Sequence, residues 1–230
     1  MPPEPLFRRD DTALLVVDMQ NAFCHPDGGF AQVGRDVTAQ NGVIPTVVSL
    51  VRAARAADVP VLWTIQEGLG ADDRARLRLR IPRLLGRPGA GEPETWSIRD
   101  SWDAELIDAL RDERRPEDHV IRKLRMSAFY STTLDSTLRI RRISCLIVVG
   151  VNTEKCVEST VRDASFRDYD VVVVNDAVAT TDRAFHEDSL RKIDTYFGTV
   201  LSSRAVIEAL SAIGGDAARA EDPGLLGGTK

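Results

Sequence analysis

The chain has 230 residues, of which 43% are hydrophobic and 28% charged, and its formal net charge is −5 at pH 7. This length is enough to bury a core without a disulfide or metal, and the negative charge argues against nucleic acid or an anionic membrane surface as a partner. No apolar run reaches the roughly 18 residues of a membrane span, and the N-terminus lacks the features of a signal peptide. Three scattered cysteines are typical of free thiols in a reducing compartment. We therefore expect a soluble, cytoplasmic globular protein.

Short apolar segments alternate with segments of helical periodicity along the chain. Strands are predicted at 13–17, 59–65, 119–121, 143–151, 171–174 and 200–201, and helices at 42–57, 132–142, 153–168, 183–197 and 204–213. The strands are continuously apolar, which is typical of a parallel sheet that is covered on both faces. The pattern predicts an α/β protein with right-handed crossovers.

Residues 68–100 interrupt this alternation with an irregular, arginine-rich excursion. Six arginines precede a Pro/Gly-rich stretch at 88–93: Arg74, Arg76, Arg78, Arg80, Arg83 and Arg87. A connection of this length is functional or mobile. We interpret it as a solvated excursion or a subunit contact, with binding of an acidic partner as the alternative. The Gly/Ala-rich tail at 214–230 is expected to be frayed.

Three predicted strands end in residues that can carry chemistry. Asp18 follows the first strand, Lys123 the third, and Cys156 lies shortly after the fourth. The carboxyl ends of parallel strands meet at one edge of the sheet, where ligands bind. A carboxylate, an amine and a thiol at that edge form the grouping that nucleophilic catalysis requires.

Each of these residues also has a structural interpretation. An aspartate at a strand end is often a turn former, a lysine is usually solvated, and a cysteine is most often a small buried hydrophobe. We apply the last interpretation to Cys145. Cys156 differs because it lies in the first turn of a predicted helix, where the dipole favours a thiolate and backbone N–H groups can hold an oxyanion. The pair Cys24-His25 is a rival nucleophile that we rank below Cys156.

Three segments resemble the signatures of isochorismatase-like cysteine hydrolases. They are LLVVDMQNAF at 14–23, Lys123 with Ser127-Ala128-Phe129, and GVNTEKCV at 150–157. The resemblance runs from about residue 12 to 210. The block CVESTVRD at 156–163, with Tyr169 and Phe197-Gly198, is most similar to the ureidoacrylate amidohydrolase branch, and biuret hydrolases are near relatives.

The resemblance implies a single domain over residues 1–230, with a Rossmann-like three-layer α/β/α sandwich around a six-stranded parallel sheet. It implies a catalytic triad of Asp18, Lys123 and Cys156 and a non-proline cis peptide between Val151 and Asn152. The backbone N–H groups of Asn152 and Cys156 would form the oxyanion hole. The implied reaction is hydrolysis of a C–N bond in a small amide, carbamoyl or ureido compound through an acyl-enzyme.

The chain also departs from some relatives. Nicotinamidases carry an Asp-x-His element after the second strand that helps bind a metal, whereas residues 63–68 contain no histidine. We therefore predict no metal and no cofactor. Where the ureidoacrylate branch often has a tyrosine shortly after the lysine, this chain has Met126. The expected substrate contacts are Phe23, Gln66, Glu67, Phe129 and Tyr130.

Other functions stay open from the sequence. An isochorismatase-type enzyme would use Asp18 to protonate a vinyl ether and leave Cys156 idle. A non-catalytic α/β binding module or a thiol redox protein comes from a different class, although Cys156 has no C-x-x-C partner. A dinucleotide-binding domain is disfavoured because no G-x-G-x-x-G follows the first strand. The expected partner is a small-molecule substrate, and relatives indicate a homo-oligomer.

Overall fold

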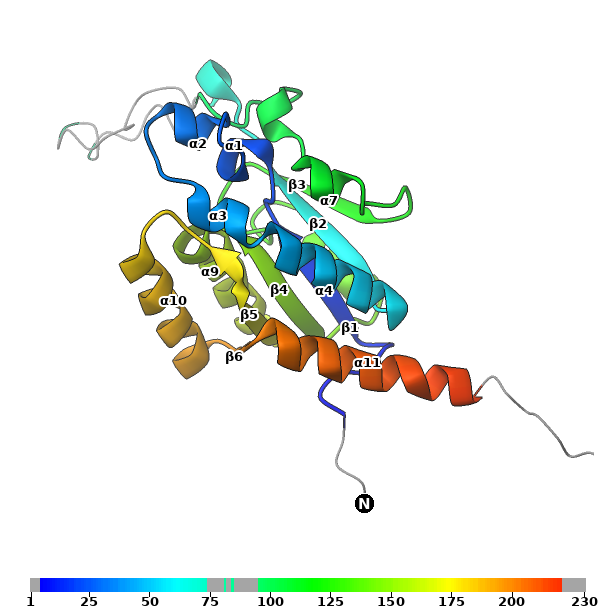
Figure 1. Ribbon diagram of the computed structural model, residues 1–230. Helices are drawn as coiled ribbons and strands as arrows, with labels where there is room; N and C mark the ends of the chain where they lie inside the picture. Colours follow the sequence, from blue (N-terminus) through cyan, green and yellow to red (C-terminus); the bar gives the residue numbers. More distant parts are fainter. Residues whose placement is uncertain (1–4, 74–80, 82–83, 85–94, 221–230) are drawn as a thin grey trace, which may run out of the picture.

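A six-stranded parallel sheet forms the centre of the molecule (Figure 1). The computed structural model describes residues 5–73, 81, 84 and 95–220. The strand order is β3-β2-β1-β4-β5-β6, and every neighbouring pair is parallel. The strands are β1 (Thr12–Val17), β2 (Val61–Gln66), β3 (His119–Lys123), β4 (Cys145–Val151), β5 (Asp170–Ala179) and β6 (Thr199–Leu201). The predicted α/β class and six-stranded parallel sheet are confirmed.

Helices cover both faces of this sheet (Figure 1). One layer contains α1 (Asn21–Cys24), α2 (Gly29–Gln32), α3 (Thr38–Gly42), α4 (Ile44–Ala56), α7 (Asp108–Arg111) and α11 (Ser203–Ala220). The opposite layer contains α8 (Leu134–Ile140), α9 (Glu158–Ser165) and α10 (Arg183–Tyr196). Along β1, Leu14 and Val16 pack into the first layer, and Leu15 and Val17 pack into the second. Burial on both faces explains why the strand sequences are continuously apolar.

Three elements differ from the sequence prediction. The predicted helix at 153–168 is divided into a π-helical turn (Thr153–Val157) and α9. Strand β5 continues to Ala179, past the exposed polar residues Asn175 and Asp176 that suggested its end. Helix α11 extends to Ala220 and so includes the first part of the segment at 214–230 that we expected to be frayed. The arginine-rich residues at 74–80, 83 and 87 lie outside the described part of the chain.

The order of the strands places β1 next to both β2 and β4, so the chain reverses its direction of winding at β1. Ligands bind near such a switch point, beyond the carboxyl ends of the strands. Gly150 allows β4 to approach β1 here, because its φ is +116° and an added Cβ would lie 2.1 Å from the carbonyl oxygen of Val17. The residue after Val17 is Asp18. The glycine therefore lets the two strand ends that carry Asp18 and Cys156 lie close together.

Within the described residues, no helix combines the length and the apolar character needed to cross a membrane.

Candidate active site

A buried ion pair lies at the carboxyl edge of the sheet. The carboxylate Oδ2 of Asp18 lies 2.6 Å from Nζ of Lys123, and both side chains are 0% exposed. Asp18 has a positive φ of +50°, a left-handed conformation that aspartate adopts more readily than most residues. The turn after β1 thus brings the carboxylate to the lysine at the end of β3.

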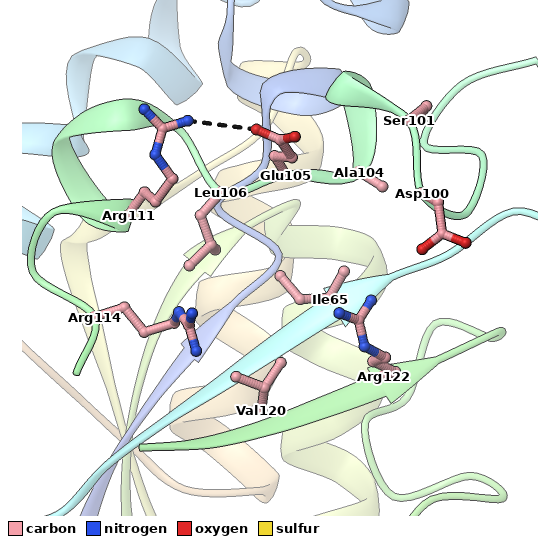
Figure 2. Close-up of a pocket in the computed structure, with 10 residues that line it drawn as sticks. All are labelled: Ile65, Asp100, Ser101, Ala104, Glu105, Leu106, Arg111, Arg114, Val120 and Arg122. Carbon is pink, nitrogen blue, oxygen red and sulfur yellow. Dashed lines mark hydrogen bonds and ion pairs between the residues drawn. The ribbon is translucent and has the colours of Figure 1, made fainter. Parts of the chain in front are cut away.

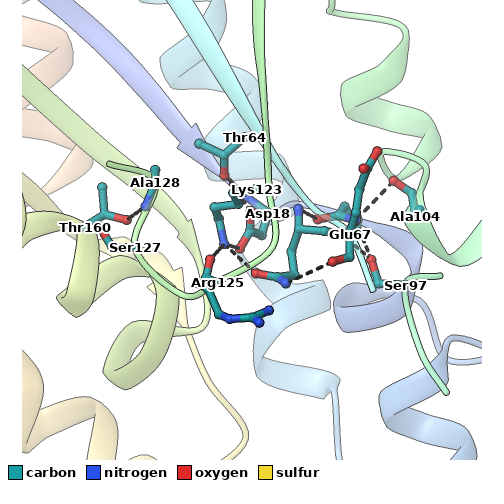
Figure 3. A network of polar contacts seen from close by, with 12 residues as sticks. Asp18, Thr64, Glu67, Ser97, Ala104, Lys123, Arg125, Ser127, Ala128 and Thr160 are labelled. Atoms are coloured by element: carbon teal, nitrogen blue, oxygen red, sulfur yellow. Dashed lines mark hydrogen bonds and ion pairs between the residues drawn. The ribbon is translucent and has the colours of Figure 1, made fainter. Parts of the chain in front are cut away.

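Both members of the pair have further polar partners (Figure 3). The hydroxyl of Thr64 donates to Oδ1 of Asp18 at 2.5 Å and accepts from the Asp18 backbone N–H at 3.1 Å. The Lys123 ammonium donates to Oε1 of Gln66 at 2.9 Å and to the Arg125 carbonyl at 3.2 Å. Burial would lower the pKa of Lys123, but the charges of Asp18 and Cys156 outweigh it and raise that pKa. The lysine is therefore a fixed cation in a dry site.

Cys156 completes the cluster from the π-helical turn. Its side chain is buried and interacts electrostatically with the side chains of Asp18 and Lys123. Burial raises the pKa of the Cys156 thiol to about 12, and Asp18 adds to this against the opposing effect of Lys123. Desolvation thus outweighs the stabilisation of a thiolate that we expect from the helix N-terminus. The thiol needs a base before it can react.

Asn152 begins the turn that carries Cys156. The peptide bond between Val151 and Asn152 is cis, at the position that the resemblance implies. The Asn152 side chain is buried, and its Oδ1 accepts a hydrogen bond from Nε2 of Gln40 at 3.0 Å. The next residue, Thr153, shares a 2.9 Å contact between its Oγ1 and Nδ1 of His186. The segment before the cysteine is thus held by α3 on one side and α10 on the other.

The expected substrate contacts are dispersed. Gln66 reaches the ion pair through Lys123, as described above. Glu67 is buried, and its carboxylate is engaged by Arg99 at 2.7 Å and by Arg122. The ring of Phe23 packs on that of Phe30 at 4.9 Å, and the ring of Phe129 packs on Tyr169 at 5.7 Å. Tyr130 is 61% exposed. Of these residues, Gln66 forms a side-chain hydrogen bond with Lys123, and contact of all five with a substrate stays a prediction.

A separate cavity of about 530 Å³ lies beside β3 and the segment from 100 to 114 (Figure 2). Its walls include Arg111, Arg114 and Arg122 around the apolar side chains of Leu106 and Val120. Asp18, Lys123 and Cys156 do not line it. Successive residues of a strand point to opposite faces, so Arg122 faces this cavity while its neighbour Lys123 faces Asp18.

The other cysteines and histidines have different surroundings. Cys24 is buried in the core. The pKa of its thiol is raised mainly by this burial and to a smaller extent by the charge of Asp18. His25 packs edge-on against Trp102 at 5.0 Å. Cys145 is partly buried at the opposite end of β4, and burial raises its pKa to about 11. The Cys24-His25 pair therefore has no reactive geometry, because the thiol lies in the core and the imidazole contacts a different ring.

The position where nicotinamidases hold a metal has other contacts here. Gln66 accepts from Lys123, and the Glu67 carboxylate is bound by two arginines. Over the described residues, no group of three or more His, Cys, Asp or Glu side chains is arranged to hold a metal ion. These donor groups do not fit the metal of those relatives.

Sequence reasoning did not identify Thr64 or Gln40. Thr64 is the polar residue within the apolar strand VLWTIQ, in register with Val17. A buried hydroxyl beside the residue that precedes Asp18 is a signal that could have identified it, because buried polar groups need partners. Gln40 lies in a short helix that has no sequence motif, and its contact with Asn152 spans 112 positions of the chain.

Comparisons with known proteins agree with this geometry. Residues 12–205 match the Isochorismatase domain family. The chain is 38% identical over 220 residues to ureidoacrylate amidohydrolase RutB of Methylorubrum extorquens, an alignment that covers 91% of this chain and 87% of that protein. Among solved structures, a cysteine hydrolase from Pseudomonas syringae superimposes with a TM-score of 0.76 at 29% identity, covering 93% of this chain and 100% of the other.

A further solved structure, N-carbamoylsarcosine amidase from Thermoplasma acidophilum, has a TM-score of 0.64 and 26% identity, with 84% of this chain and 96% of that chain covered. The fold and these matches define the class first: the chain belongs to the isochorismatase family. Within that family it is an amidohydrolase, an enzyme that acts on C–N bonds other than peptide bonds.

Proposed function

We propose that the protein is a cysteine-dependent amidohydrolase in which Cys156 attacks the carbonyl carbon of a small linear amide, carbamoyl or ureido compound. The observation that carries this proposal is a buried cluster of three groups: the Asp18–Lys123 ion pair, with 2.6 Å between Oδ2 and Nζ, and the buried Cys156 thiol, which interacts electrostatically with both. An acid–base pair beside a protonated nucleophile is what general-base activation of that nucleophile requires.

The acylation step follows from the state of the thiol. Because burial raises its pKa to about 12, Cys156 is protonated at neutral pH and Asp18 must accept the thiol proton as the sulfur attacks. The S–C bond forms, the carbonyl oxygen becomes an oxyanion, and the C–N bond then breaks while Asp18 returns the proton to the leaving nitrogen. Lys123 keeps its positive charge throughout, because its raised pKa holds the proton.

The oxyanion is assigned to the backbone N–H groups of Asn152 and Cys156. This proposal is supported by the position of both residues in the turn after β4, at the edge where the triad meets. A single donor of this kind contributes about 2.7–4 kcal/mol to transition-state stabilisation, and a general base contributes roughly 10²–10⁴-fold in rate. The second half of the reaction reverses the roles: Asp18 takes a proton from water, the water oxygen attacks the thioester carbon, and the sulfur leaves as the thiol.

The names of two similar proteins indicate which substrates to test first. Ureidoacrylate amidohydrolase and N-carbamoylsarcosine amidase both refer to a carbamoylated nitrogen. We therefore place ureido and N-carbamoyl compounds first among the substrates, ahead of simple amides. We propose that such a substrate contacts the side chains of Phe129 and Tyr130, which follow Ser127. Tyr130 is 61% exposed.

The test combines a substrate panel with variants of Cys156. We expect ammonia release from at least one ureido, carbamoyl or amide compound, and we expect Cys156→Ala and Cys156→Ser to lower kcat by more than about 10³-fold. Cys145→Ser is the matched control, because that thiol lies at the opposite end of β4, and it should leave kcat unchanged. Full hydrolysis by Cys156→Ala would refute the cysteine mechanism.

A vinyl-ether hydrolase with Asp18 as the acid is the remaining alternative within the family. Mass spectrometry of the enzyme quenched during turnover and then digested distinguishes the two mechanisms. An acyl mass on the peptide that contains Cys156 supports the amidohydrolase, whereas turnover of isochorismate without an adduct supports the alternative.

We also propose that the protein is cytoplasmic and forms a homo-oligomer. Light scattering after size-exclusion chromatography measures the oligomeric state.

A further inference from the structure

We propose that Thr64 is a positioning residue that makes Asp18 a one-sided base, so that the proton of Cys156 is transferred to Oδ2 and never to Oδ1. This inference rests on the proposed function and adds to it the atom that accepts the proton and the residue that selects this atom.

The direction of the Thr64 hydroxyl follows from its two contacts. The backbone N–H of Asp18 can only donate, and it donates to Oγ1 of Thr64 at 3.1 Å. The hydroxyl proton is then available for the second contact, the 2.5 Å bond to Oδ1 of Asp18. Both groups are 0% exposed, so no water competes for either position. Thr64 therefore presents a donor to Oδ1.

The opposite oxygen has different surroundings. Nζ of Lys123 lies 2.6 Å from Oδ2 as a charged partner, while the ammonium donates to Gln66 and to the Arg125 carbonyl. Among the described residues, Oδ2 has no aligned hydrogen-bond donor although it is fully buried. A buried carboxylate oxygen without a donor is an open acceptor. The Cys156 thiol interacts with both Lys123 and Asp18, and Lys123 is paired with Oδ2, so Oδ2 is the oxygen that we assign to the thiol.

The strand register explains how Thr64 reaches Oδ1. It pairs with Val17 in the parallel ladder of β1 and β2, directly before the left-handed turn at Asp18. Its two hydrogen bonds join the backbone and the side chain of Asp18 to one hydroxyl, so the carboxylate cannot rotate without breaking a bond.

The Thr64→Val variant replaces the hydroxyl by a methyl group of similar size, so it removes the hydrogen bonds to Asp18 and keeps the packing. In Thr64→Val, Oδ1 loses its donor, the carboxylate can rotate, and its ionised form is less favoured. We expect kcat to fall about 10- to 100-fold with KM within about threefold, since the base is misplaced while substrate contacts remain. The acid limb of the pH profile of kcat/KM should move to higher pH.

The experiment uses the full chain and compares Thr64→Val with two single-residue controls and with a double variant. Thr64→Ser keeps the hydroxyl and should restore both kcat and the acid limb. Thr12→Val is the matched control, because Thr12 is a buried threonine at the other end of β1, and it should leave both unchanged. In an Asp18→Asn background, Thr64→Val should cause no additional loss of kcat.

Alkylation of Cys156 by iodoacetamide between pH 6 and 9, followed by peptide mass spectrometry, provides a readout that needs no substrate. We expect a slower reaction in Thr64→Val and a normal one in Thr64→Ser. A wild-type pH profile and alkylation rate in Thr64→Val would overturn the inference. If Thr64→Val does not fold, loss of activity in folded Thr64→Ser overturns it instead. Failure of the proposed function is a separate outcome, since it appears as full activity in Cys156→Ala.

Discussion

Two charged networks lie at the carboxyl ends of β1, β2 and β3 and differ in solvent access. Asp18 and Lys123 form one, and both side chains are 0% exposed. Glu67, Arg99 and Arg122 form the other, in which the carboxylate is 1% exposed but the two arginines are 51% and 61% exposed. Each network thus has one buried carboxylate. The networks differ in the exposure of the cations, because Lys123 is fully buried whereas the two arginines are in contact with solvent.

The difference follows from the alternation of β3 and from the chemistry of the two cations. Lys123 points toward the sheet edge where Asp18 lies, and Arg122 points toward the cavity of Figure 2. A guanidinium keeps its proton at any working pH and binds a carboxylate through several donors, whereas a buried ammonium is a compact charge that responds to its surroundings. In the second network, Glu67 at the end of β2 is bonded to Arg99, which follows the isolated bridge between Gly68 and Ile98. We therefore interpret this network as structural.

The largest expected effect separates the neighbouring cations of β3. Lys123→Met leaves Asp18 as an uncompensated buried charge, so it should lower the free energy of unfolding by about 3–5 kcal/mol and abolish ammonia release. Arg122→Met removes a cation whose partner still has Arg99, and it should cost about 1 kcal/mol or less. Urea denaturation and the hydrolysis assay measure both. Equal losses in the two variants would contradict the distinction between the networks.

The two buried carboxylates, Asp18 and Glu67, should also differ, because we expect only Asp18 to be needed for catalysis. Asp18→Asn removes the proposed base and should lower kcat by about 10²–10⁴-fold. Glu67→Gln keeps a similar shape and should leave kcat within about tenfold, although the buried amide can no longer match two guanidinium groups and stability should fall by about 1–3 kcal/mol. Steady-state kinetics on the best substrate of the panel distinguish them. A larger loss of kcat in Glu67→Gln would place the chemistry at the arginine network.

The smallest effect concerns the protonated thiol. The pKa of Cys156 rises from its ordinary value of 9.0 to about 12 because of burial, so above pH 9.0 the unfolded chain loses this proton before the folded protein does. Folding stability should therefore fall as pH rises, by up to about 1.4 kcal/mol per pH unit for this group. Cys156→Ser lacks this contribution.

Urea midpoints at pH 8, 9, 10 and 11 provide the measurement. The wild type should lose stability more steeply than Cys156→Ser above pH 9.0, the ordinary pKa of the thiol. The raised pKa of Lys123 makes the ion pair lose its contribution only when pH rises above the ordinary lysine value of 10.5. Because Cys156 contributes to that raised pKa, this loss differs between the two proteins, and the points up to pH 10 carry the comparison. Parallel curves would mean that the thiol is not protonated in the folded protein.

Much of the site could be predicted because the topology of a parallel sheet is simple. Continuous apolar runs indicated strands buried on both faces, and the residues that follow such strands meet at one edge. That argument assembled Asp18, Lys123 and Cys156 from the ends of three different strands, and in the structure Asp18 and Lys123 form an ion pair that interacts with the buried Cys156 thiol. It needed only the order of strands and the polarity of the residues at their ends.

Other features depend on packing that no local pattern encodes. Glu67 resembled a substrate contact, but the return of a distant segment brings Arg99 to it. The sequence indicated a helix N-terminus that favours a thiolate at Cys156, but it did not indicate the burial that raises the pKa of this thiol. The bond between Thr64 and Asp18 depends on a register between strands 46 positions apart.

The amino-acid sequence was thus sufficient for the fold class, the reactive residue types and their common edge, because hydrophobic periodicity and strand order are local or topological properties. The protonation state of the thiol, the partner of each charge and the atom of Asp18 that stays open to accept a proton required the folded structure. Desolvation and hydrogen-bond direction decide these properties, and both depend on which distant side chains exclude water and which donors lie within reach.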